Sequence, residues 1–155
     1  MYKRQGIGPG SYAGTRIAIS AAIGLQNANR AKLVGIPSIC AIQVDAPEYF
    51  VIGDARRQSF YSAQIRDHLY EKIDLWTFNE MCARLSDLPS NMPIFTSEKL
   101  PHFPQAKLVY PSALLLARLA ESGKYAETAT PLEPIYLREP HITTPKKSVP
   151  STIFG

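Results

Sequence analysis

The sequence predicts an α/β protein built from two small lobes, and three observations support that expectation. A glycine-rich loop at 6–11 precedes an almost wholly apolar segment at 15–25, a pattern typical of a strand end followed by a helix. The clearest strand patterns come later, at 49–54 and 59–65, joined by a short polar turn. The segment 45–47 (Asp-Ala-Pro) interrupts both kinds of pattern, so we expect the lobe boundary there.

Length and composition exclude several classes of protein. The chain has 155 residues, 45% hydrophobic and 19% charged, which is too apolar for wholesale disorder and suits one domain or two lobes sharing a core. No apolar run approaches the roughly eighteen residues of a membrane span, and the first ten residues contain no signal-peptide core. Cys40 and Cys82 lack CxxC partners, which indicates reduced thiols, no metal or redox motif, and a cytoplasmic location.

The charge of the chain is mildly positive. Its net charge is +4, and the basic residues are scattered, so the chain tolerates an anionic partner without requiring one. No arginine-rich block or zinc-finger spacing indicates direct reading of a nucleic-acid sequence. None of the three histidines is spaced from another ligand in the way that a metal site on a helix requires.

In the first lobe, Ser11 is the expected N-cap of a helix that runs to about Asn29, because its hydroxyl can accept from an unpaired N–H. The residues before the glycine loop, 2–5, lack apolar alternation and are a poor match to a strand. A short buried strand is predicted at 32–36. Proline suits the first turn of a helix, so a short helix is predicted at 37–44.

In the second lobe, three strands at 49–54, 59–65 and 69–75 are predicted to form a β-meander. A helix at 80–85 is expected to begin near Thr77. The remaining predicted elements are a strand at 93–96, a short strand at 107–110, a helix from about 112 to 122 ended by Gly123, and an extended segment at 131–138.

The first helix carries a stripe of mostly small residues, spaced three or four apart. The stripe consists of Ala13, Ile17, Ala21, Gly24 and Ala28. One interpretation is that it packs in the core beneath a sheet. The other is that it forms a helix–helix interface with another subunit, since small residues let two backbones approach closely. Both interpretations can hold on different faces of one helix.

Two places are candidates for phosphate chemistry. Gly8, Gly10 and Ser11 precede a helix whose N–H groups and dipole favour an anion, although the spacing is neither a Walker motif nor GxGxxG. The alternative there is a tight strand-to-helix turn with a good cap. Asp54, followed by two arginines, could position a phosphate or a metal. The alternative there is a hairpin turn with one local ion pair.

Four motifs in order along the chain resemble the bacterial TsaB (YeaZ) family. Residues 6–17 (GIGPGSYAGTRI) resemble the signature GxGPGSFTGxRIG, and 33–38 resemble the strand and turn that follow it. Residues 53–61 (GDARRQSFY) are similar to the DARRxEVY element, and 134–138 (PIYLR) to a closing PxYLR. The chain departs from the family with Ala13 for Thr, Ala18 for Gly and Ser59 for Glu.

The resemblance implies an actin-like (ASKHA) two-lobe fold, also called a Gcp-like domain. The family carries a first strand, a β-hairpin and a helix ahead of the glycine loop, so we expect a truncated chain whose first strands are missing. The division that follows is a remnant of the N-terminal lobe at 1–46, the C-terminal lobe at 47–138 and a flexible tail at 139–155. Missing strands would uncover the first helix, so we expect poor solubility.

The resemblance further implies a cytoplasmic, non-catalytic subunit in the synthesis of N6-threonylcarbamoyladenosine at position 37 of tRNA. In that pathway TsaD is the transferase, a TsaE-like ATPase takes part, and TsaB supports TsaD or pairs with itself. This chain would meet tRNA indirectly, through the complex. The sequence lacks the HxxxH metal motif of TsaD, so we expect no catalytic residue, metal or cofactor.

Two alternatives stay open: an ASKHA-type nucleotide-binding phosphotransferase, and a degenerate threonylcarbamoyl transferase fragment. Under the scaffold interpretation, the first helix docks the partner. The predicted interface residues are Ala13, Arg16, Ile17, Ser20, Ala21, Gly24 and Ala28.

Overall fold

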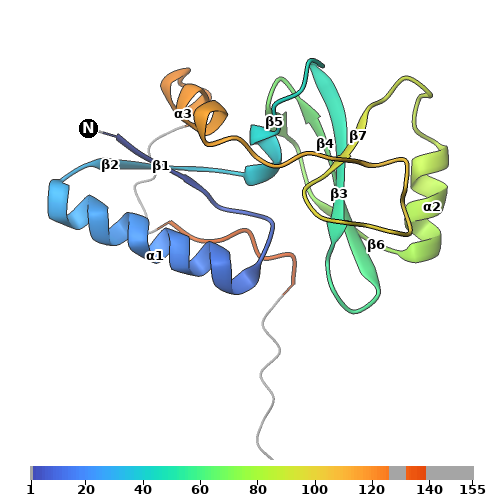
Figure 1. Cartoon of the computed structure of the whole chain (residues 1–155), viewed down its shortest axis with the longest axis horizontal. Coiled ribbons are helices and arrows are strands. Elements are labelled where there is room, and N and C mark those ends of the chain that lie inside the picture. Colours follow the sequence, from blue (N-terminus) through green and yellow to red (C-terminus); the bar gives the residue numbers. More distant parts are fainter. Residues whose placement is uncertain (1, 126–131, 139–155) are drawn as a thin grey trace, which may run out of the picture.

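A computed structural model describes residues 2–125 and 132–138 of the chain. These residues form two β-sheets with helices packed around them (Figure 1). The first sheet contains two parallel strands, β1 (Tyr2–Gly6) and β2 (Lys32–Ile36). The second contains six strands. The predicted tail at 139–155 lies outside the described residues.

Helices α1 (Tyr12–Asn29) and α3 (Ala113–Glu121) pack against opposite faces of the two-stranded sheet. Side chains of β2 alternate between the two faces, as a strand requires. Leu33 packs with Ile19 of α1, whereas Val34 and Ile36 pack with Leu119 of α3. Each face therefore has its own small apolar cluster.

Strand β1 corrects the expectation that residues 2–5 do not form a strand. Every residue from Tyr2 to Gly6 is paired in register with β2, and the Ile7 N–H donates to the Ile36 carbonyl at 3.0 Å. Backbone pairing holds the strand, so it needs no apolar alternation. The side chains of Lys3, Arg4 and Gln5 are half-buried, and the Arg4 guanidinium forms an ion pair with Glu121 on α3 at 2.5 Å.

Helix α1 begins where the cap predicts. The Ser11 hydroxyl accepts from the Gly14 N–H at 3.2 Å, and the helix ends at Arg30, whose backbone is left-handed at φ 48°. A left-handed residue commonly ends a helix, and its N–H donates here to the Gln26 carbonyl. The predicted strand-to-helix turn with a good cap is confirmed.

The second sheet has the strand order β5-β4-β3-β7-β8, with β6 also paired to β4. Its strands are β3 (Glu48–Asp54), β4 (Ser59–Arg66), β5 (Leu69–Tyr70), β6 (Asp74–Thr77), β7 (Ile94–Thr96) and β8 (Lys107–Leu108). The β3–β4 pair is antiparallel, as predicted, whereas β7 runs parallel to β3 and β8 runs parallel to β7. A separate apolar cluster covers each face, one of them closed by α2 (Phe78–Ser86).

Two predicted elements differ from the structure. The strand predicted at 69–75 is two strands, β5 and β6, which pair with opposite ends of β4. Asp67 and His68 follow β4, and both have positive φ, so they form a tight turn. After this turn only Leu69 and Tyr70 pair with the end of β4, and the chain then leaves the sheet until β6 begins. The helix predicted at 37–44 is a single 3₁₀ turn, η1 (Ser38–Ala41), because Ile42 is already extended.

A set of hydrogen bonds joins the two sheets. The Tyr125 hydroxyl, just after α3, donates to the His68 carbonyl at 2.6 Å, and the His68 Nδ1 bonds the Cys40 carbonyl at 2.9 Å. The Tyr49 hydroxyl donates to the Ile39 carbonyl at 3.1 Å. Helix α3 follows the second sheet in sequence but packs on the first.

The boundary between two lobes that the sequence predicts at residue 46 stays a prediction.

Across the described residues, no helix has both the length and the apolar character that a membrane crossing needs. Cys40 and Cys82 are both free thiols, as their spacing predicts.

Candidate functional site

A cleft of about 740 Å³ lies between the start of α1 and the turn that joins β3 to β4. It brings together segments that are far apart in the sequence. It is lined by Gly10, Ser11, Tyr12, Ala13, Thr15, Asp54, Ala55, Arg56, Arg57, Ser97, Glu98 and residues 134–138.

The glycine loop supplies one side of the cleft but not with all of its residues. Gly8 is buried, and its backbone is bonded to Ser38: its carbonyl accepts from the Ser38 N–H at 2.7 Å, and its N–H donates to the Ser38 hydroxyl at 3.2 Å. Glycine suits this position because the backbone φ is +94°, a value that residues with a side chain rarely adopt. Gly10 and Ser11, in contrast, face the cleft.

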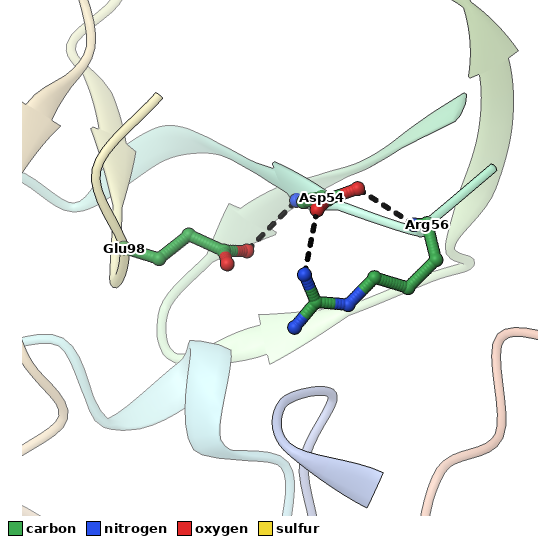
Figure 2. A network of polar contacts seen from close by, with 3 residues as sticks. All are labelled: Asp54, Arg56 and Glu98. Carbon is green, nitrogen blue, oxygen red and sulfur yellow. Dashed lines mark hydrogen bonds and ion pairs between the residues drawn. The ribbon is translucent and has the colours of Figure 1, made fainter. Parts of the chain in front are cut away.

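The β3–β4 turn supplies the opposite side, and Figure 2 shows its polar contacts. The Asp54 carboxylate accepts from the Arg56 N–H at 2.6 Å and from the Arg56 guanidinium at 3.0 Å. The Asp54 N–H donates to the Glu98 carboxylate at 2.8 Å. The hairpin turn with one local ion pair is therefore confirmed, and both Asp54 oxygens are committed to the turn.

The floor beneath the turn is tightly packed. Gly53 lies under the ring of Tyr61, and an added side-chain carbon would overlap that ring, so only glycine fits. Burial raises the pKa of the Tyr61 hydroxyl, and the negative charge of Glu98 adds to the effect. Tyr61 thus keeps its hydroxyl proton and forms a hydrogen bond with the Ser97 side chain.

The cleft unites most of the candidate phosphate residues. Gly10, Ser11 and Asp54 line one cavity, whereas Gly8 is turned toward Ser38. Within the described residues, no group of three or more potential metal ligands occurs. Phosphate binding in this cleft stays a prediction.

Sequence reasoning missed several residues of the cleft. The ring of Tyr136 lies beside that of Tyr12, with centroids 5.4 Å apart and the planes tilted by 39°, and Arg138 donates to the Ser59 hydroxyl at 2.7 Å. Glu98 also was not singled out. The PIYLR segment at 134–138 could have indicated Tyr136 and Arg138 as site residues, because it is a motif to which the sequence analysis assigned no role.

A second cavity of about 540 Å³ lies on the other side of the β3–β4 turn. Its lining is formed by Arg57, Gln58, Ser59, Phe60, Thr77, Phe78, Asn79 and His102. Phe78 and His102 meet edge to face with ring centroids 5.7 Å apart. Arg57 is shared by both cavities.

The outer face of α1 is open along its length. Only Ile19 and Ala22 of this helix are buried, whereas Ile17 is 69% exposed and Leu25 is 49% exposed. All the predicted interface residues are exposed, namely Ala13, Arg16, Ile17, Ser20, Ala21, Gly24 and Ala28. Core packing is therefore wrong for this stripe, because a different face of the helix contacts the sheet.

The fold is a mixed α/β arrangement of two sheets, with a cleft bordered by the start of α1 and the β3–β4 turn. Two solved structures from Pseudomonas aeruginosa resemble it. One is an uncharacterised protein with similarity to peptidase YeaZ, with a TM-score of 0.63 and 21% identity, covering 86% of this chain and 71% of that one. The other is YeaZ, with a TM-score of 0.57 and 16% identity, covering 85% and 72%.

These likenesses show that the chain has a YeaZ-like fold. No protein-family model matches the sequence, and no curated protein matches it.

Proposed function

We propose that this protein is a non-catalytic scaffold subunit in the synthesis of N6-threonylcarbamoyladenosine at position 37 of tRNA. It binds a TsaD-like transferase and holds it in place, with a TsaE-like ATPase in the same complex. The motifs that resemble TsaB and the YeaZ-like fold support this proposal.

The single observation that carries the proposal is the open face of α1. Ile17 and Leu25 expose large apolar side chains on this helix, whereas Ala21 and Gly24 have little or no side chain. No atom lies within 4 Å of where a Gly24 side chain would begin, so this position is free on its outer side. Such a face can receive a helix of another protein at close range, burying apolar surface that now faces water.

Co-purification tests the proposal. The chain is expressed with the TsaD-like protein of the same organism, which carries an affinity tag, and a variant with Ala21→Trp serves as the comparison. We expect the unchanged chain to be retained and the variant to be lost from the eluate. Failure of the unchanged chain to be retained would refute the scaffold role.

A second function has one observation in its favour. The cleft gathers Gly10, Ser11 and Asp54, the residues that a nucleotide-binding phosphotransferase would use. Against it, Arg56 holds both oxygens of Asp54, so a metal would have to displace an ion pair. Calorimetric titration with ATP and Mg²⁺ separates the two functions: saturable binding that Asp54→Asn abolishes would favour the enzyme.

A further inference from the structure

The β3–β4 turn stands between the two cavities and presents arginine side chains to both. Arg56, Arg57 and Gln58 are successive left-handed residues, at φ 63°, 53° and 57°, so the turn has a sharply defined shape. Arg138 reaches the base of the turn and donates to the Ser59 hydroxyl at 2.7 Å. In Figure 1 the β3–β4 turn lies at the lower end of the second sheet. Three guanidinium groups therefore border one surface.

The charges of this surface do not cancel. The Asp54 carboxylate is paired with Arg56 at 3.0 Å. Among the described residues, neither Arg57 nor Arg138 has an acidic partner. The Glu98 carboxylate lies beside the turn and accepts from the Asp54 N–H at 2.8 Å. Two guanidinium groups are thus available to an anionic ligand.

Exposed aromatic rings flank the turn on both sides. Tyr12 and Tyr136, 51% and 42% exposed, form a pair in the cleft. Phe78, 43% exposed, forms a pair with His102 in the second cavity. Guanidinium groups for phosphates, with aromatic rings on either side for bases, are the combination that binds single-stranded nucleic acid.

We propose that this surface, made of the turn at 54–59, Arg138 and the two aromatic pairs, binds single-stranded RNA directly. The arginines contact the phosphates, and unpaired bases stack on the rings. The inference deepens the proposed function, since it gives the scaffold its own contact with the single-stranded anticodon loop. Its chemistry needs no partner subunit, which makes it testable on the chain alone.

Fluorescence anisotropy on the full chain tests the RNA contact. The probe is a labelled anticodon stem-loop of a tRNA that reads an ANN codon, and the competitor is a blunt, fully paired RNA duplex with the same number of nucleotides. We expect salt-dependent binding that the duplex competes for poorly. Equal competition by the duplex would overturn the proposal, because stacking on rings needs unpaired bases.

Variants separate the two kinds of contact. Arg57→Gln should weaken binding and lower the slope of log K against log salt by about 0.7, the value for one phosphate contact on a single strand. His102→Ala should weaken binding about fivefold or more and leave the slope unchanged, whereas His102→Tyr should restore affinity. The matched control is Arg118→Gln, an exposed arginine on α3, which lies at the top of Figure 1 whereas the β3–β4 turn lies at the bottom.

Retention by the TsaD-like protein is measured on the same variants. Arg57→Gln and His102→Ala leave the α1 face intact, so both should still be retained. Loss of RNA binding with retention kept confirms the RNA surface. RNA binding by a wild-type chain that is not retained refutes the proposed function alone. If Arg57→Gln and Arg118→Gln bind RNA equally, the RNA surface is wrong and the scaffold role is unaffected.

Discussion

The two sheets of this protein are stabilised to very different extents by their own chain. The six-stranded sheet is covered on both faces, with Phe50 and Ile52 packed on one side and Tyr49 and Val51 on the other. The two-stranded sheet is covered by α1 and α3, yet only two residues of α1 are buried. The comparison teaches that the six-stranded sheet is packed on both faces by its own chain, whereas α1 leaves the apolar side chains of Ile17 and Leu25 exposed.

The largest expected effect comes from the core of the six-stranded sheet. Phe50 is 2% exposed, and Phe50→Ala should lower the free energy of unfolding by about 3–5 kcal/mol, because it leaves a cavity that the sheet cannot close. Urea unfolding followed by circular dichroism measures the loss. A loss below about 1 kcal/mol would mean that this region does not carry the stability that its packing indicates.

Alkaline pH should destabilise the joint between the regions. Burial raises the pKa of the Cys40 thiol from 9.0 to about 11, so the folded chain keeps a proton that the unfolded chain loses. The stabilisation is complete below pH 9 and is lost as the pH rises toward 11, by about 1.4 kcal/mol per pKa unit. Burial also raises the pKa of Tyr49 and Tyr125.

Urea unfolding at a series of pH values, with Cys40→Ala as the control, isolates the thiol contribution. The variant should show a shallower fall in the free energy of unfolding just above pH 9. Identical pH profiles would contradict a thiol that is buried and protonated in the folded chain.

Helix caps offer a matched test of the two regions. At α2 the Thr77 hydroxyl accepts from the Glu80 N–H, and the Glu80 carboxylate accepts from the Thr77 N–H at 2.8 Å. At α1, Ser11 accepts one bond and has no reciprocal acid. Thr77→Ala should cost about 1 kcal/mol, and Ser11→Ala less, each measured as a shift in the urea midpoint. The reverse order would show that α1 depends on its cap more than α2 does.

The smallest effect on folding is expected on the outer face of α1. Ile17 is 69% exposed, so Ile17→Ala should change the free energy of unfolding by no more than about 0.5 kcal/mol. The same change should weaken retention by the TsaD-like protein, because it removes an apolar contact from the interface. A large loss of stability in the isolated chain would show that Ile17 already packs within this protein.

Local chemistry made several elements predictable from the sequence. Ser11, Thr77 and Ser112 each begin a helix where a hydroxyl cap indicates one. The β3–β4 hairpin followed from apolar runs around a polar turn. These signals act over a few residues, so no distant partner is needed to interpret them.

Long-range pairing made other features unpredictable. Strand β1 is held by its backbone bonds to β2, which leave no apolar pattern in residues 2–5. The strand predicted at 69–75 is interrupted after a tight turn in which Asp67 and His68 have positive φ values, and the residue types Asp and His do not by themselves predict such values. The contact of Tyr12 with Tyr136 joins opposite ends of the chain, so the aromatic part of the cleft could not be assembled from sequence alone.

The most direct test of the account is the affinity of a Gly24→Trp variant for the purified TsaD-like protein, measured by titration calorimetry. The control is Ala83→Trp, an exposed alanine on α2 at the other end of the molecule. We predict that Gly24→Trp keeps its melting temperature and binds at least about thirtyfold more weakly, while Ala83→Trp binds like the unchanged chain. Equal affinity of Gly24→Trp and the unchanged chain would contradict the assignment of α1 as the docking face.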